Sequence, residues 1–374
     1  MEHSAGFVPP AAVALLDLLF LLLPLPLIVI ANWHEAPPAG DGTLARAAVA
    51  LGSTVWMLLA MVAAVCILLA LVTVALTSPG VSSSGRGIVP YAAIMLSTGI
   101  AAAALISESA RSALARVIPI DPRSAVHATA LVLTVVLVGS QLANQLAVDV
   151  LSQQASAAAP ALTPIDLIAQ ELPFLLAAVL GVGLFIRRDF SATLDRLGFV
   201  RPNVWQLVLG LGAALVFFAF GSGMDALNHA LSPGTAQKVE AANQHLFGQL
   251  GNPIGIATIA LSAGICEEAL FRGAMQPRLS ILWTAIVFTT VHTQYGLSLD
   301  AVAVLVLAIG LGLVRRVANT TTSTVCHVVY NTLVGVVVSG PLIGPAAIAG
   351  VVLVAASAGA AFFTSRLGNL KTAP

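Results

Sequence analysis

Three apolar segments in the second half of the sequence contain ionisable or amide side chains. These are Glu267, Glu268, Arg272, His292, His327 and Asn331. A charged side chain at the centre of a membrane costs about 2.5–3.5 kcal/mol on the insertion scale, so such residues usually serve a function. A Glu and a His can together activate a water molecule, and a second His with an Asn can stabilise an oxyanion. The residue types therefore indicate hydrolysis.

The spacing of the first three residues assigns them different tasks. Glu268 and Arg272 are four residues apart, which places them on one helix face, where a carboxylate and a guanidinium can pair. Glu267 is turned about 100° away, so Arg272 cannot neutralise both carboxylates equally. A Glu–Arg pair that only fixes helix packing would explain Glu268 and Arg272, but it leaves Glu267 unexplained. Glu267 is the expected general base.

The remaining residues are expected to reach the same depth. His327 and Asn331 are four residues apart on one face, and His292 stands alone in its segment. Counted from the predicted cytoplasmic helix ends, Glu267, His292 and His327 lie roughly 13, 18 and 16 Å deep, at about 1.5 Å per residue. Three helices of alternating direction thus place polar groups in one layer. The same three residues could instead supply a zinc site with two His and one Glu.

The composition indicates that a membrane surrounds these groups. Of the 374 residues, 58% are hydrophobic and only 9% are charged, and the mean hydropathy is +0.98. A water-soluble domain has about 25% charged residues. The formal net charge is zero and no dense basic block is present, which excludes nucleic-acid binding. Apolar residues occur in runs rather than alternating, which disfavours an outer-membrane barrel. The expected fold class is all-α, a polytopic transmembrane helical bundle.

Apolar runs of about 20 residues, the length needed to cross a membrane, predict eleven spans. They are 11–31, 47–77, 88–106, 125–148, 167–186, 204–222, 254–276, 280–297, 300–314, 321–339 and 342–364. Asp17 lies alone in the first span and is interpreted as a helix-packing residue. The connection 187–203 is predicted to contain a short amphipathic helix with Phe190, Leu194 and Leu197 on one face.

Basic residues orient the bundle, because they collect in cytoplasmic loops. Thirteen of the sixteen lie in alternate connections on one side: Arg46, Arg111, Arg116, Arg123, Arg187, Arg188, Arg196, Arg201, Arg278, Arg315, Arg316, Arg366 and Lys371. The opposite connections hold only Arg86 and Lys238. We therefore expect an integral protein of a bacterial plasma membrane, with its N-terminus outside and its C-terminus in the cytoplasm.

The connection 149–166 is rich in Ala, Ser and Pro, and it is the expected boundary between two portions of the chain. Residues 1–163 would form an N-terminal four-helix membrane region of unknown role, without a chemically suggestive cluster. Residues 164–374 would form the catalytic domain, with a motif core at about 250–345.

The three motifs resemble those of a known protein family. The patterns Glu-Glu-x-x-x-Arg, Phe-x-x-x-His and His-x-x-x-Asn begin at Glu267, Phe288 and His327. In order and spacing they are similar to the motifs of the CPBP family, the group of Rce1-type CAAX prenyl endopeptidases and bacterial self-immunity-type intramembrane proteases. The flanking sequence EEALFRGAMQPRL is also similar to the usual surroundings of the first motif. The resemblance implies an Rce1-like C-terminal core.

This resemblance implies an intramembrane endopeptidase that hydrolyses a peptide bond in a membrane-associated protein or peptide. Glu267 would activate water, aided by His292, and the His-x-x-x-Asn motif would hold the oxyanion. Glu268 and Arg272 would shape the site. Proteins of this family are described both as metalloproteases and as glutamate proteases. We expect no required cofactor, with Zn²⁺ as the alternative. The implied partners are membrane lipids and a peptide or membrane-anchored protein substrate.

Two other classes of function are weighed against the protease. An ion-coupled transporter would also bury Glu, His and Arg at one depth, but it would usually show inverted repeats, and the sequence shows no convincing repeat. A non-catalytic membrane scaffold or immunity protein would keep the fold without needing all six polar residues, and every motif position is intact here.

Overall fold

The computed structural model describes residues 22–36, 42–75, 87–156, 161–336 and 340–371, which form a helical bundle without a β-strand. The helices are α2 (Pro24–His34), α3 (Gly42–Ala75), α4 (Ile88–Ala104), α5 (Glu108–Leu114), α6 (Ala125–Ala147), α7 (Val150–Gln154), α8 (Pro164–Gly181), α9 (Phe190–Leu197), α10 (Val204–Leu231), α11 (Pro233–Phe247), α12 (Pro253–Glu267), the π-helix η3 (Glu268–Met275), α13 (Gln276–Val291), α14 (Leu299–Val317), α15 (Thr320–Gly335) and α16 (Ile343–Lys371). The predicted all-α class is confirmed. Asp17 and residues 11–21 of the first predicted span lie outside the described residues.

Within the described residues every predicted span coincides with a helix, but six helical stretches, not eleven, are long and apolar enough to cross a membrane. They are Gly52–Ala75, Ala125–Ala147, Pro164–Gly181, Val204–Leu231, Pro253–Val291 and Ile343–Thr364, with a seventh if the bent pair of α4 and α5 is one span. By length and composition alone, the described residues thus contain fewer membrane-crossing stretches than the eleven predicted. α15 has only 16 residues, and the 19-residue α14 carries Asp300, Arg315 and Arg316. Such helices depend on their neighbours for burial.

The stretch Pro253–Val291 folds back on itself at Ser280. In one continuous helix Phe271 and Phe288 would lie about 25 Å apart, because each residue adds about 1.5 Å. Their ring centroids are 5.1 Å apart. Ser280 has a φ of 68° and a ψ of 174°, far from helical values. The stretch therefore consists of two antiparallel legs, as the separate predicted spans 254–276 and 280–297 require.

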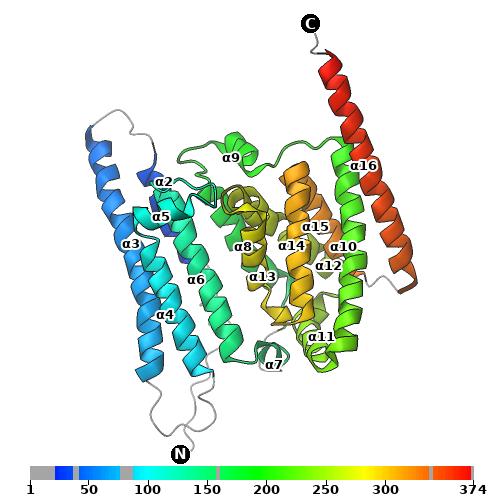
Figure 1. The fold of residues 1–374 in the computed structure, drawn as a ribbon, viewed down its shortest axis with the longest axis horizontal. Coiled ribbons are helices and arrows are strands. Elements are labelled where there is room, and N and C mark those ends of the chain that lie inside the picture. Colours follow the sequence, from blue (N-terminus) through cyan, green and yellow to red (C-terminus); the bar gives the residue numbers. More distant parts are fainter. Residues whose placement is uncertain (1–21, 37–41, 76–86, 157–160, 337–339, 372–374) are drawn as a thin grey trace, which may run out of the picture.

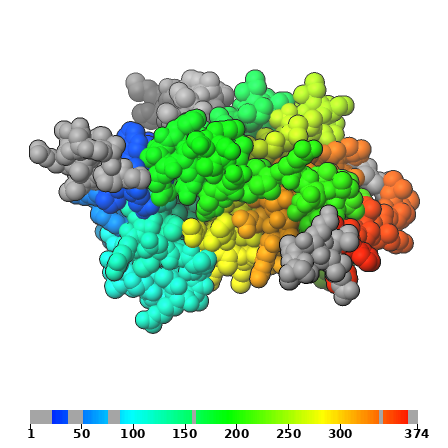
Figure 2. All heavy atoms as spheres, turned by 90° about the horizontal axis from the view of Figure 1, so that it is seen from above, coloured from blue at the N-terminus to red at the C-terminus, as the bar shows by residue number. Residues whose placement is uncertain are grey.

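Loops and short helices lie at the two ends of the bundle. Figure 1 shows α9 at the upper end, and α7 with α11 at the lower end. Seen from the upper end, the connection that contains α9 (green) runs across the middle of the molecule (Figure 2). Arg278 and Arg315 lie close to Arg196 of α9, whereas Lys238 belongs to α11 at the other end. These four residues follow the predicted separation of basic residues, and which end faces the cytoplasm stays a prediction.

The short helix predicted in the connection 187–203 is α9, and its predicted apolar face of Phe190, Leu194 and Leu197 is only partly buried. Phe190 is 59% exposed, whereas Leu197 is fully buried and packs in a cluster with Ala178 and Ala269. The buried side of α9 is formed by Thr193 and Leu197. Contacts with the rest of the bundle, rather than the amphipathic pattern, therefore set which side is buried.

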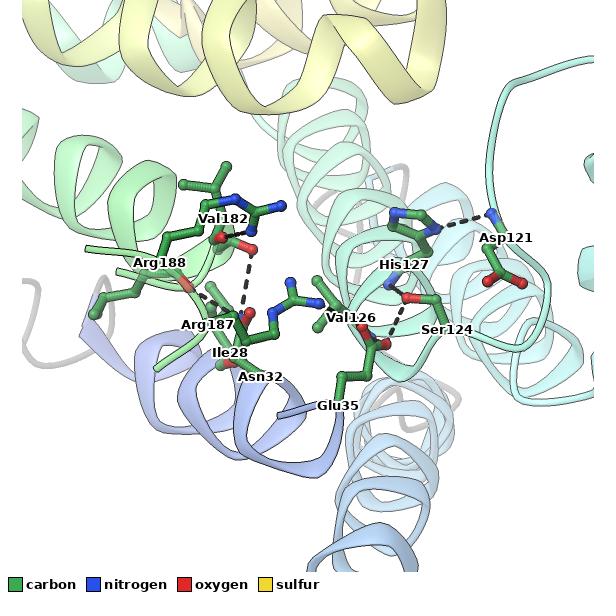
Figure 3. Close-up of polar contacts among 12 residues, drawn as sticks. Ile28, Asn32, Glu35, Asp121, Ser124, Val126, His127, Val182, Arg187 and Arg188 are labelled. Atoms are coloured by element: carbon green, nitrogen blue, oxygen red, sulfur yellow. Dashed lines mark hydrogen bonds and ion pairs between the residues drawn. The ribbon is translucent and has the colours of Figure 1, made fainter. Parts of the chain in front are cut away.

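The N-terminal portion packs directly against the C-terminal portion. Leu137 and Val138 of α6 contact the buried cluster that contains Phe271 and Phe288. At the α9 end lies the fully buried Asn32 of α2, labelled in Figure 3. Its amide donates a hydrogen bond of 2.9 Å to the carbonyl of Leu180. The expected domain boundary near residue 163 is thus crossed by shared core packing, and it stays a prediction.

An ion pair reinforces this contact. Glu35, which follows α2, accepts from Arg187 at 2.7 Å, from the Ser124 hydroxyl at 2.6 Å and from the Val126 backbone N–H at 2.8 Å (Figure 3). Both side chains of the Glu35–Arg187 pair are about one-fifth exposed. One carboxylate therefore ties α2, the start of α6 and the connection after α8 together.

Candidate active site

The first motif spans a change of helix type. Glu267 ends α12, and the π-helix begins at Glu268. The sequence predicted an α-helix across 254–276, so this part of the prediction is wrong. A π-helix holds more residues per turn, and such segments are frequent at functional sites. Nε of Arg272 still lies 3.6 Å from Oε2 of Glu268, and both side chains are fully or almost fully buried.

Helix α15 reaches this pair because Gly264 of α12 has no side chain. A Cβ atom on Gly264 would lie 2.5 Å from Cγ2 of Val328 and 3.2 Å from its backbone nitrogen. Any larger residue would push α15 away. The residue before Val328 is His327, whose Nδ1 lies 3.2 Å from Oε1 of Glu268 in a buried hydrogen bond. Glu268 thus lies between Arg272 and His327.

Glu267 faces both histidines. Its Oε1 lies 3.8 Å from Nε2 of His292, and its Oε2 lies 3.9 Å from Nε2 of His327. In a continuous helix Glu267 and His292 would be about 37 Å apart. The reversal at Ser280 brings them together, and the predicted meeting of Glu267, His292 and His327 is confirmed.

His292 stands at the end of α13, not inside a span as predicted, because the helix ends at Val291. Its Nδ1 lies 2.8 Å from the carbonyl oxygen of Phe288, and its ring stacks on the Phe288 ring with centroids 4.4 Å apart. A carbonyl oxygen only accepts, so Nδ1 carries a hydrogen, and in the neutral ring the Nε2 lone pair faces Glu267. The Phe288 ring also lies 4.8 Å from Cζ of Arg272. Phe288 therefore positions both residues.

Residues 249–333 match the family model described as type II CAAX prenyl endopeptidase Rce1-like. This is an Rce1-like segment. It contains all three motifs, so the resemblance predicted from them is confirmed, and it indicates a membrane peptidase of the CAAX-protease type. No curated protein and no solved structure matches the chain.

Of the six predicted site residues, Asn331 is the one without a polar contact to the others in the part of the chain that the structure describes. It lies one turn beyond His327 on α15 and is half-buried. Among the described residues no hydrogen bond or ion pair joins it to the other five predicted site residues. Its amide is therefore not held by the buried pair of Glu268 and Arg272.

Glu171 of α8 is a third buried carboxylate, which the motifs did not reveal. It is 8% exposed, and its Oε2 has no hydrogen-bond partner in the part of the chain that the structure describes. It lies near enough to Glu267 for the two carboxylates to repel each other. α8 packs against both α12 and the π-helix, which explains this proximity. The sequence could have identified Glu171, because a Glu inside the predicted span 167–186 has the same free-energy cost in a membrane as Glu267.

The Rce1-like segment has the donor types of a zinc site, but their separations do not fit one. Two ligands of a tetrahedral zinc lie about 3.4 Å apart, because each is about 2.1 Å from the metal. The corresponding separations from Glu267 to His292 and His327 are 3.8 and 3.9 Å. Over the described ranges, no group of three His, Cys, Asp or Glu side chains is arranged to hold a metal ion. As they lie here, these residues form no zinc site.

Proposed function

We propose that the protein is an intramembrane endopeptidase that cleaves a peptide bond in a membrane-associated protein or peptide, with Glu267 as the general base. The observation that carries this proposal is the convergence of two imidazole Nε2 atoms on the two oxygens of Glu267. The match of residues 249–333 to an Rce1-like family model supports the same reaction class.

The arrangement around Glu267 suits a water molecule. In neutral His292, Nε2 is an acceptor, because Nδ1 carries the hydrogen that the Phe288 carbonyl accepts. Two acceptors 3.8 Å apart repel each other unless a hydrogen donor lies between them. A water molecule donates two hydrogens, one to Glu267 and one to His292. This would orient the oxygen lone pair towards a substrate carbonyl carbon.

The oxyanion would be held on the opposite side by α15. The carboxylate of Glu268 lies 3.2 Å from Nδ1 of His327 and fixes the orientation of that ring. When the ring carries a hydrogen on Nε2, this N–H and the amide of Asn331 would donate to the developing oxyanion. As the C–N bond breaks, Glu267 would pass the proton taken from water to the leaving amine. Water and peptide thus yield a carboxylic acid and an amine, and transfer of the remaining acid proton gives a carboxylate and an ammonium.

The test is turnover of a lipid-anchored fluorescent peptide by the purified full-length protein, with the cleavage products identified by mass spectrometry. Glu267→Gln keeps the size of the side chain but cannot take a proton, so turnover should fall about 10²–10⁴-fold. Glu240→Gln is the matched control, since Glu240 is 72% exposed in α11. Full turnover by folded Glu267→Gln protein would remove Glu267 from the mechanism.

Cleavage and ion flux, both measured with the wild type and Glu267→Gln in vesicles, separate the other classes. A non-catalytic scaffold would show no cleavage by either protein. An ion-coupled transporter would show proton or ion flux that depends on Glu267, again without cleavage. Cleavage that requires Glu267 is expected only of the peptidase.

A further inference from the structure

Five arginine side chains gather at the end of the bundle that carries α9. These residues, called here the arginine cluster, are Arg187, Arg188, Arg196, Arg278 and Arg315. They come from the α8–α10 connection, the start of α13 and the end of α14, and all are half-buried. Burial and the guanidiniums of the other four members lower the pKa of Arg196 to about 10. The cluster is therefore a concentration of like charge with reduced access to water.

Few carboxylates offset this charge. Within the described residues only Arg187 of the cluster forms an ion pair, at 2.7 Å from Glu35. Arg188 and Arg196 donate to backbone carbonyls instead. Nε of Arg278 is buried without a hydrogen-bond partner in the described part of the chain. A group of partly desolvated cations with one paired carboxylate is stabilised by an external anion.

Backbone hydrogen bonds fix the turn that carries Arg187 and Arg188. The carbonyl oxygen of Gly183 accepts from the backbone N–H groups of Ile186, Arg187 and Arg188, at 3.2, 2.9 and 3.0 Å. Gly183 has a φ of 94°, which favours glycine. The two arginines therefore start from a fixed turn, visible in Figure 3 beside α2.

Two aromatic side chains of the same connection are exposed. Phe185 and Phe190 are 81% and 59% exposed. Phe185 has a φ of 58°, a conformation that is rare for a bulky residue. Exposed aromatic rings next to basic side chains are typical of protein segments at the membrane–water interface. Exposed aromatic rings beside the arginine cluster therefore favour a lipid headgroup over a soluble anion as its ligand.

We propose that the arginine cluster binds the phosphate of an anionic phospholipid headgroup, with Phe185 and Phe190 inserted beside it at the membrane interface. Arginine is suited to phosphate because its planar fork donates two parallel hydrogen bonds. A headgroup anion would relieve the repulsion among cations from three parts of the chain and hold those parts together.

The site adjoins the catalytic helix. Nη1 of Arg196 donates to the carbonyl of Gly273 at 3.2 Å, and Gly273 directly follows Arg272 in the π-helix. A bound headgroup would therefore stabilise the contact between α9 and the π-helix. This inference does not depend on the proposed peptidase activity, because its primary readout is stability.

The test measures the melting temperature of the full-length protein in vesicles of phosphatidylcholine alone and of equal parts phosphatidylcholine and phosphatidylglycerol. A thiol-reactive fluorophore reports unfolding, because Cys66, Cys266 and Cys326 are buried in the folded protein. The variants are Arg278→Gln and Arg315→Gln. Arg316→Gln is the matched control, since it removes the same charge from an exposed neighbour on α14.

We expect phosphatidylglycerol to raise the melting temperature of the wild type and of Arg316→Gln by several degrees. For Arg278→Gln and Arg315→Gln the rise should fall to half or less. In phosphatidylcholine alone these two variants should be at least as stable as the wild type, because repulsion is reduced. An equal response of all four proteins would overturn the proposal. If dissolved glycerol phosphate gave the full rise in phosphatidylcholine vesicles, the lipid assignment would be overturned in favour of a soluble phosphate ester.

Discussion

Nδ1 of His327 lies 3.2 Å from Oε1 of Glu268, in a hydrogen bond between residues 59 positions apart. The same carboxylate is paired with Arg272 one turn away. A single fully buried side chain thus compensates a buried cation and orients an imidazole of the candidate site. Glu268 is therefore expected to matter for stability as much as for chemistry.

Glu268→Gln should destabilise the protein by about 3–5 kcal/mol, because it leaves Arg272 as a buried charge without a partner. Thermal unfolding in one detergent would measure the loss. The double variant Glu268→Gln with Arg272→Met should recover most of it, because the stranded charge is gone. A double variant no more stable than the single one would show that the pair is not the cause. Glu267→Gln should unfold like the wild type.

Glu171→Gln should leave the protein as stable as the wild type or more stable. The substitution removes a buried, unpartnered carboxylate that repels Glu267 while keeping its size. The gain should be about 1 kcal/mol, the size of an ordinary single-site effect. Thermal unfolding with and without the change measures it. A clear loss of stability would mean that Glu171 makes a stabilising contact as an anion.

The ion pair between Glu35 and Arg187, which joins the two portions of the chain, should contribute measurably to the free energy of unfolding. Arg187→Met removes the ion pair with Glu35 and should cost about 1.5–3 kcal/mol, the range for a hydrogen bond to a charged group. Arg123→Met is the matched control, since Arg123 and its partner Glu108 are 83% and 57% exposed. That change should cost less than about 1 kcal/mol. Equal losses in an unfolding titration would show that Glu35 and Arg187 do not join the two portions.

At the other end of the bundle, Asp149 and Lys238 give a pH dependence. A hydrogen bond from Lys238, then the backbone and hydroxyl of Ser152, lower the pKa of Asp149 from 3.8 to about 2. The folded pKa lies below the unfolded one, so the stabilisation is present above pH 3.8 and is lost as the pH falls through about 2.

The measurement is the difference in melting temperature between wild type and Asp149→Asn from neutral pH downwards. The difference should be small, because both side chains are half exposed and solvent screens the pair. It should be constant to about pH 4 and then shrink. A difference that grows on acidification would contradict the assignment.

Chelation of metal ions should leave peptide turnover unchanged within about two-fold. The distances from Glu267 to the two histidines are longer than those between ligands of one zinc ion. Turnover would be compared before and after incubation with phenanthroline. A loss that added zinc restores would show that the side chains close around a metal, and Glu267 would then be a ligand.

The residues of the candidate active site were the most predictable part of this molecule. An ionisable group in an apolar run stands out because of its cost in lipid, and the depth count placed Glu267, His292 and His327 together, as the structure does. The reversal at Ser280 was implied by the same count. Glu171 followed the same rule but had no motif partner, so it was missed.

Features that depend on backbone register or on the choice of helix faces could not be predicted. Whether residues 268–275 adopt an α- or a π-helix depends on hydrogen bonds that the pattern of side chains does not specify. An apolar helix such as α6 shows no distinct face in its sequence, so the contact of Leu137 and Val138 with the Phe271 cluster left no signal.

The reversal at Ser280 also sets the order in which the site is completed during synthesis. Glu268 and Arg272 are close in the chain, so their charges can offset each other as soon as that helix enters the membrane. His292 joins Glu267 once the second leg has folded back. His327 and Asn331 follow only when α15 has been made. A ribosome-bound chain that stops before α15 therefore lacks the two side chains proposed to hold the oxyanion, and on that proposal the nascent protein stays inactive until α15 has joined the bundle.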